Sequence, residues 1–320
     1  MHEVIKQIAD LSQEQSDFMI ATVVKTWRSS PRPAGSVMLV DQEGRMYGSV
    51  SGGCIEKVVL EQTLNLMSEG KAELMTFGVA DEEAWEVGLS CGGKVSVFIE
   101  PYKKEVWRSV FANPDQSQVL ITKMEQRPQY LNLDQLPDDV NEEVRSLIRK
   151  EQSGVVDDLF VRVMPKQPTM LMVGAAHITF ELIQLAHLHG FKTIVIDPRD
   201  TFTHKSHIPE APDELHACWP QEVINNVDLD QHTYAVILSH DPKIDDPALH
   251  VLLKSEVKYI GALGSRRTHQ KRIDRLVEAG FNQSEIDRIH APVGLDIGAM
   301  TAAEIALSVM AQVVDVKNSD

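Results

Sequence analysis

The chain has 320 residues, of which 43% are hydrophobic, and it carries 47 acidic against 31 basic side chains. A single hydrophobic core rarely grows beyond about 250 residues, so this length predicts two domains. The net charge of −16 repels phosphate backbones, which excludes a general nucleic-acid-binding protein. A small phosphate-bearing ligand can still bind where arginine side chains or helix N-termini concentrate positive potential locally.

Neither a membrane span nor a secretory signal is expected. The longest apolar stretches, residues 169–176 and 234–238, are far shorter than the roughly 20 residues that cross a bilayer. The chain starts with Met1-His2-Glu3-Val4 and shows no cationic and apolar leader. The sequence therefore predicts a cytoplasmic protein.

Three cysteines are present, at positions 54, 91 and 218. An odd number in a reducing compartment argues against a disulfide scaffold. One ferredoxin-type [2Fe-2S] cluster takes four Cys ligands, so this chain alone cannot carry an electron relay of that kind.

The first half of the chain contains short strand-like runs separated by Gly and Pro. Strands are expected over residues 20–26, 37–40, 95–100, 119–124 and 159–164, and helices over residues 54–67 and 141–150. The first of these helices has an apolar stripe and stops at Gly70. These elements predict a mixed α+β domain over residues 1–165.

From residue 169 onward, buried-type strands alternate with helical segments at the spacing of a parallel sheet with crossover helices. Strands are expected over residues 169–174, 193–197, 234–239 and 258–261, and helices over residues 177–189, 247–254, 268–279 and 301–314. Pro165 and Pro168 mark the entrance. The predicted fold class is α/β, with a Rossmann-like parallel sheet and helices on both faces over residues 166–320.

The first candidate site is the strand, turn and helix start around Gly174. Glycine lets the backbone approach a pyrophosphate, whose charge then lies at the helix N-terminus. Asp197 ends the next strand at the offset of a ribose-binding carboxylate, and His177 adds a donor at the helix entrance. Ala176 stands where a dinucleotide fingerprint has its second glycine, which weakens that interpretation. The alternative is a structural turn in which the Asp is a cap.

A second candidate site is the turn at residues 260–267, which also leads from a strand into a helix. Gly264 permits close approach, Ser265 can cap the helix, and Arg266 and Arg267 can bind an anion at its N-terminus. The same helix continues with Lys271, Arg272 and Arg275. In so acidic a chain this cluster favours an anion site, and the alternative is a capped helix with a solvated basic face.

Two cysteines of the first half are flanked by glycine pairs. Gly52 and Gly53 precede Cys54, and Cys91 precedes another Gly-Gly pair. A thiolate at a helix N-terminus is stabilised and can bind a soft metal or react. The alternative is a small buried hydrophobic residue. Neither cysteine belongs to a CxxC pair, which argues against zinc.

A polar loop follows the strand predicted to end at Ser239. His240 and Asp241 would lie at the carboxyl edge of the sheet, where they can hydrogen-bond a ligand ring or bind a divalent ion. The alternative is a turn with an Asp cap before a helix at Pro247. A metal site at His204 and His207 is a weaker hypothesis.

These motifs occur together in an order that is specific for one family. They are residues 29–32, 48–56 and 91–93 in the first half, and 197–199, 240–241, 259–267, 292–298 and 304–308 in the second. Over nearly its whole length the chain resembles the XdhC/CoxI family, accessory proteins for xanthine dehydrogenase and carbon monoxide dehydrogenase type enzymes. Ala176, where the family usually has Gly, is the clearest departure.

The resemblance implies a maturation factor, not the hydroxylase itself. Such a factor binds the molybdenum cofactor, as molybdopterin or its dinucleotide form, supports its sulfuration and passes it to the apo-hydroxylase. The implied partners are that apo-molybdenum hydroxylase and a cysteine desulfurase type sulfur donor, and a homodimer stays open.

We expect the cofactor between the two domains, with its phosphate near Arg266, Arg267 and the turn at Gly174. Cys54 or Cys91 would lie near the molybdenum, since a thiolate is a suitable soft ligand. The residues expected to bind the cofactor are Arg32, Gly52, Gly53, Cys54, Cys91, Gly174, His177, Asp197, Arg199, His240, Asp241, Gly264, Ser265, Arg266 and Arg267.

Two other functions stay open at this stage. One is an NAD(P)-dependent oxidoreductase that uses the Rossmann-like domain, although no hydride-transfer acid/base pair is evident. The other is a scaffold that joins a sulfur donor to the apo-hydroxylase and retains no pterin.

Overall fold

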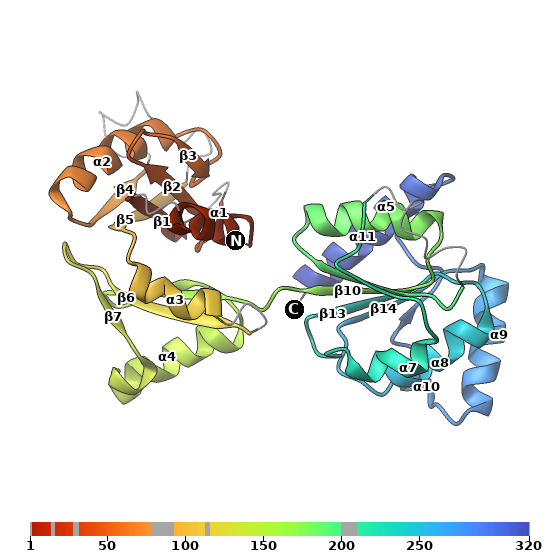
Figure 1. Cartoon of the computed structure of the whole chain (residues 1–320). Helices are drawn as coiled ribbons and strands as arrows, with labels where there is room; N and C mark the ends of the chain where they lie inside the picture. Colours follow the sequence, from red (N-terminus) through yellow and green to blue (C-terminus); the bar gives the residue numbers. More distant parts are fainter. Residues whose placement is uncertain are drawn as a thin grey trace. The chain divides into compact units, whose positions relative to one another are not determined.

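The computed structural model describes residues 2–13, 17–27, 32–78, 93–112, 116–199 and 210–319. The chain divides into two compact units, Met1–Lys166 and Gln167–Asp320 (Figure 1). Of the residues singled out in the sequence, positions 29–31, Cys91, His204 and His207 lie outside the described ranges.

Unit 1 contains a five-stranded antiparallel sheet in the order β3-β2-β1-β5-β4. Its strands are β1 (Phe18–Trp27), β2 (Val37–Asp41), β3 (Met46–Gly48), β4 (Glu73–Phe77) and β5 (Lys94–Pro101). Helix α2 (Glu56–Glu69) packs on one face, against a cluster that includes Val59 and Val97, while α1 (His2–Gln13) packs on a second cluster through Ile8 and Leu11. The central strand β1 is buried over residues 18–24, and its apolar side chains pack on both faces of the sheet.

A second antiparallel sheet of unit 1 has the order β7-β6-β9-β8. It is formed by β6 (Gln118–Lys123), β7 (Gln129–Leu131), β8 (Gly154–Val156) and β9 (Leu159–Met164), with α3 (Lys104–Ala112), the short 3-10 turn η2 (Leu133–Gln135) and α4 (Asp138–Arg149). The strands expected at 119–124 and 159–164 and the helix expected at 141–150 are confirmed within a few residues. The sequence did not predict β4, β7 or β8, which are short and partly exposed.

Unit 2 is built on a parallel sheet in the order β12-β11-β10-β13-β14-β15 within the described residues. The strands are β10 (Thr169–Val173), β11 (Lys192–Ile196), β12 (Glu214–His216), β13 (Thr233–Ile237), β14 (Tyr259–Ala262) and β15 (Ile289–His290). Strand order reverses between β10 and β13, so this is the point at which open α/β sheets bind ligands beyond the carboxyl ends of their strands.

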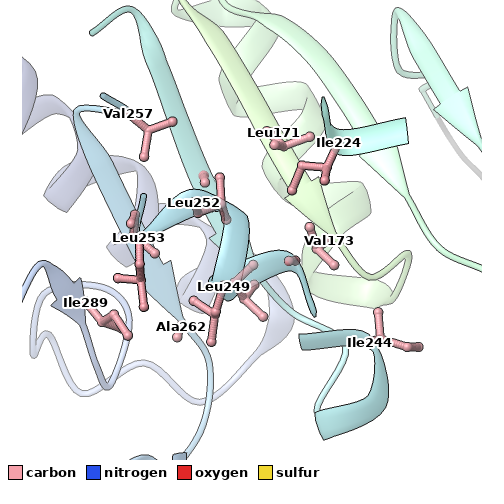
Figure 2. Packing of buried hydrophobic residues seen from close by; sticks show 14 of the residues in the cluster. Leu171, Val173, Ile224, Ile244, Leu249, Leu252, Leu253, Val257, Ala262 and Ile289 are labelled. Atoms are coloured by element: carbon pink, nitrogen blue, oxygen red, sulfur yellow. The ribbon is translucent and has the colours of Figure 1, made fainter. Parts of the chain in front are cut away.

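Helices cover both faces of this sheet, as predicted (Figure 1). On one face lie α5 (His177–Leu188) and α11 (Ala302–Asn318), and on the other α7 (Pro220–Val223), η4 (Ile224–Asn226), α8 (Pro242–Leu252), α9 (Arg266–Glu278) and α10 (Gln283–Ile286). Figure 2 shows Leu171 and Val173 of β10 packed with Ile224, Ile244 and Leu249. Each such buried side chain contributes about 1.5–3 kcal/mol by leaving water.

One helix start was predicted wrongly. Helix α8 begins at Pro242, not at Pro247, and the Asp241 carboxylate caps it by accepting from the Lys243 amide at 3.0 Å. Proline is favoured in the first turn of a helix, and the sequence offers two prolines here, of which the first is the one used. Pro247 lies inside the helix, where it removes one backbone donor.

Among the described residues, no helix combines the length and the apolar character that a bilayer crossing demands.

Candidate functional site

The carboxyl ends of the central strands of unit 2 bring several predicted site residues to one edge. The Leu238 amide donates to the Val173 carbonyl at 2.7 Å, and the Leu263 amide to the Ile237 carbonyl at 2.9 Å. The segments that follow β10, β13 and β14 therefore leave the sheet side by side. The pKa of Arg199, which follows β11, is raised by its hydrogen bond to Asp197, and the negative charges of Asp241 and Asp245 at this edge add to the shift.

The turn at residues 174–176, here called the Gly174 turn, is occupied by its own chain. The Ala175 amide donates to Asp197 Oδ2 at 2.6 Å, and the Ala176 amide donates to Thr179 Oγ1 at 3.2 Å. Two of the amides that would face a pyrophosphate, those of Ala175 and Ala176, are thus already hydrogen-bonded.

The glycine itself is required by packing. Gly174 has φ +110°, and a Cβ added there would lie 2.5 Å from the Ser239 backbone nitrogen. The residue allows the end of β10 to pass close to the end of β13, and this packing accounts for it without a ligand.

Asp197 and Arg199 form a closed pair. Arg199 donates from its backbone amide and Nε to Asp197 Oδ1, both at 2.9 Å, and from its terminal nitrogen to Oδ2 at 2.6 Å. Burial alone would raise the pKa of Asp197, but the hydrogen bonds from Arg199 and Ala175 outweigh it and lower the pKa. This fully buried carboxylate has four donors, so in this conformation its strongest acceptor sites are taken.

His240, Asp241 and His177 surround this edge in different ways. His240 is exposed and adopts φ +62°, a left-handed conformation that is uncommon outside glycine. Asp241 caps α8, which matches the alternative interpretation of that residue. His177 is exposed at the start of α5, with its ring edge-on to Phe180.

The turn at residues 264–267, here called the α9 turn, is open. Ser265 Oγ accepts from the Thr268 amide at 3.2 Å and caps α9 as predicted. Within the part of the chain that the structure describes, the amides of Gly264 to Arg267 have no hydrogen-bond partner. Arg266 and Arg267 are exposed and make no ion pair with any described residue. A helix N-terminus with unpaired amides and two guanidinium groups attracts anions.

A buried cation lies directly behind the α9 turn. Arg272 is 2% exposed, donates to the Leu263 carbonyl at 2.9 Å and lies 3.7 Å from Asp245 Oδ2. Its Nε and one terminal nitrogen have no partner among the described residues, and neither has Nδ1 of His269 one turn earlier. Burial lowers the pKa of Arg272, although the Asp245 charge opposes the shift. Buried guanidinium nitrogens are nearly always paired, so the two Arg272 nitrogens can each donate to an acceptor atom of a ligand, and the His269 ring nitrogen is a further polar group beside them.

The pairing of this cluster with acidic residues of α8 was not predicted from the sequence. Asp245 accepts from Ser239 Oγ at 2.5 Å, and Asp246 binds Arg275 through two contacts of 2.6 and 2.9 Å. The basic face of α9 is therefore partly neutralised by α8. The i, i+3 spacing of His269 and Arg272 was the signal in the sequence that could have indicated a shared face.

The glycine turn of unit 1 is also filled by a carboxylate. Glu56 Oε1 accepts from Ser49 Oγ at 2.6 Å and from the amides of Ser51 and Gly52 at 2.9 and 3.0 Å, while Oε2 accepts from the Gly53 amide at 2.9 Å. We call residues 49–53 with this side chain the Glu56 nest. Burial works against the charged form, but the hydrogen bonds from Ser49 and Ser51 prevail and lower the pKa of Glu56 to about 2.

Cys54 follows the nest and precedes α2, which begins two residues later than predicted. It is half-buried and packs against the cluster that contains Val50, Ile55 and Val59, in line with the alternative of a small apolar residue. Arg32 is exposed in the segment before β2. Among the described residues, no three His, Cys, Asp or Glu side chains are grouped as a metal would require.

The lowered pKa of Glu56 predicts a specific acid dependence of stability. The carboxylate stabilises the fold fully above its unfolded pKa of about 4.5, and this contribution is lost as the pH falls through the folded value of about 2. In urea unfolding curves, the difference in unfolding free energy between wild type and Glu56→Gln should be constant above about pH 5 and shrink from there to pH 2. A difference that stays constant over that range would contradict the nest.

Comparisons with known proteins agree with this architecture. The model described as "XdhC Rossmann domain" matches residues 170–313, and the model described as "XdhC and CoxI family" matches residues 11–78. A solved structure of a xanthine dehydrogenase from Bacillus halodurans shares the fold, with a TM-score of 0.78, 24% identity, and coverage of 98% of this chain and 95% of that one.

Three curated relatives resemble the chain over most of its length. A probable xanthine dehydrogenase subunit of Bacillus subtilis is 27% identical over 96% of this chain and 95% of its own. "Molybdenum cofactor insertion chaperone PaoD" of Escherichia coli is 26% identical over 93% and 83%. "Uncharacterized protein YqeB" of Escherichia coli is 27% identical over 99% of this chain, which spans 46% of that protein's length.

With both family models matching in the predicted order and the Rossmann sheet in unit 2, the chain belongs to the XdhC and CoxI family.

Proposed function

We propose that this protein binds the molybdenum cofactor and inserts it into a xanthine dehydrogenase type molybdenum hydroxylase. The single observation that carries the proposal is the α9 turn, an open anion site in a chain of net charge −16. Family membership and the similarity to a relative named as a molybdenum cofactor insertion chaperone support the choice of ligand.

The α9 turn fits the phosphate of such a cofactor. Unpaired amides can donate to its oxygens, and Arg266 and Arg267 add charge-assisted hydrogen bonds, which are about twice as strong as neutral ones. Arg272 offers two unpartnered buried donors beside the turn, and His269 offers an unpartnered ring nitrogen. His240 and Asp241, at the same sheet edge, are polar groups that can orient a heteroaromatic ring.

The proposal includes two transient partners. A cysteine desulfurase type sulfur donor would supply sulfur to the carried cofactor, and the apo-hydroxylase would receive it, with a homodimer as a further proposed assembly. Either Cys54 or Cys91 is the thiol proposed to lie near the molybdenum. The carrier needs no covalent turnover, because holding the cofactor and releasing it to the client are binding events.

An oxidoreductase that uses NAD(P) is less well supported. The Gly174 turn donates its amides within the chain, and Asp197 is saturated by Ala175 and Arg199. Both features that suggested dinucleotide binding therefore make hydrogen bonds within the chain. We expect titration with NADH or NADPH to give no saturable change in nucleotide fluorescence.

Cofactor retention by α9-turn variants tests the proposal. Each lost charge-assisted contact weakens binding by about 1.5–3 kcal/mol, or roughly 10- to 100-fold. We therefore expect Arg266→Ala and Arg267→Ala to retain less pterin and molybdenum after gel filtration, and the double variant to retain almost none. Lys271→Ala, which removes an equal charge from an exposed position of α9, should retain the wild-type amount. If the wild type and all four variants retain the same amount of pterin and molybdenum, the α9 turn is not the binding site.

A further inference from the structure

The Glu56 nest has the geometry of an anion site whose anion is part of the chain. Gly52 and Gly53 have φ values of +78° and +117°, and their successive amides converge on the Glu56 carboxylate. Concave arrangements of consecutive amides in such conformations bind phosphates and other anions. Apart from its two chain neighbours, no described residue has an atom within 4 Å of a Cβ added at Gly53, so that glycine is needed for its backbone conformation.

Ser51 links this carboxylate to the cysteine. Its hydroxyl donates to Glu56 Oε2 at 2.5 Å and accepts from the amides of Cys54 and Ile55, both at 3.0 Å. Ser51 is 1% exposed, so water cannot easily replace either contact. The position of the Cys54 backbone therefore depends on the carboxylate through one buried hydroxyl.

We infer that Glu56 is a positioning residue: it occupies the anion nest of residues 49–53 and thereby holds Cys54 half-buried at the entrance of α2. The glycine turn before Cys54 is internally filled, and it binds an external anion only when Glu56 is removed. Any part that Cys54 plays toward the cofactor rests on the proposed function, whereas the occupation of the nest does not.

The test combines thiol reactivity with chemical rescue. Native protein is treated with iodoacetamide, and alkylation is followed peptide by peptide, with Cys218 of unit 2 as the internal reference. Losing one charge-assisted contact corresponds to about 1.4 kcal/mol or more, so Glu56→Ala should raise the Cys54 rate at least about tenfold relative to Cys218. Glu61→Ala, an exposed acid on the same helix, should leave that ratio unchanged.

Formate should reverse the effect, because it can re-enter the vacated nest as a small carboxylate. We expect a saturable return of the Cys54 rate and of the melting temperature in Glu56→Ala, and no such return with chloride at equal ionic strength. Glu56→Gln should also raise the Cys54 alkylation rate, but formate should not reverse this effect, since the glutamine amide still fills the nest. If Glu56→Ala does not fold, Glu56→Gln provides the measurement of the Cys54 rate. A Cys54 rate that does not change relative to Cys218, or formate acting no better than chloride, would overturn the inference. Neither outcome depends on pterin binding, which is measured separately.

Discussion

Replacing Arg272 with Met should lower the unfolding free energy of unit 2 by about 3–5 kcal/mol. The substitution leaves the Asp245 carboxylate buried and without its cation, and an uncompensated buried charge is strongly destabilising. Urea denaturation, with hydrogen exchange at β13 and β14 to assign the loss to this unit, measures the effect. Glu278→Gln, on the exposed end of α9, is the control and should change stability by less than about 0.5 kcal/mol.

A double variant separates the structural role of Arg272 from its role toward a ligand. In Asp245→Asn with Arg272→Met no buried charge remains unpaired, so most of the stability should return. Cofactor retention should not return, because the two unpartnered Arg272 nitrogens beside the α9 turn are gone. If retention recovers together with stability, Arg272 only holds α9 to α8 and takes no part in binding.

Replacing Arg162 with Met should have an effect of similar size in unit 1. This arginine is 1% exposed, lies 3.7 Å from Glu100, and donates to Thr22 Oγ1 at 2.7 Å. Its guanidinium stacks over the rings of Trp107 and Phe160. It thus joins β9 to β1 and β5, and its loss should cost about 3–5 kcal/mol because Glu100 stays buried.

For this pair in unit 1, the double variant should restore both the unfolding free energy and cofactor retention. Glu100→Gln with Arg162→Met removes both charges, and Tyr130, which now donates to Glu100 at 2.8 Å, keeps an acceptor. The Arg162–Glu100 and Arg272–Asp245 pairs are both buried, with 3.7 Å between their charged atoms. The Arg162–Glu100 pair, however, lies among aromatic side chains and not beside an open turn. Reduced cofactor retention in a well-folded double variant would assign the Glu100–Arg162 pair a role in binding that we do not expect.

The fold was largely readable from the sequence because its signals are local. The apolar runs of β10, β11, β13 and β14 alternate with helical segments, and that rhythm alone predicts a parallel sheet covered on both faces. The α9 turn was readable for the same reason, since Gly264, Ser265 and two arginines are consecutive. The start of α8 was not, because two prolines five residues apart both suit a first helical turn.

The occupants of the glycine turns could not be predicted from the sequence. Of the three glycine turns that were singled out in the sequence and that the structure describes, two are filled from within, by Glu56 and by Asp197 with Arg199. Glu56 is three residues from Gly53, whereas Asp197 is more than twenty from Ala175, and nothing in either spacing says where a carboxylate will point. That outcome depends on tertiary geometry, which also decides why Arg275 forms an ion pair while Arg267 forms none with the described residues.

Backbone amide chemical shifts on addition of the molybdenum cofactor test the central claim most directly. If the cofactor's phosphate binds at the open turn, the amide resonances of residues 264–267 should move in a saturable way. That of Ala175 should stay in place, since its Asp197 partner is not displaced. Saturable shifts at Ala175 or in the Glu56 nest, with residues 264–267 unaffected, would contradict the account.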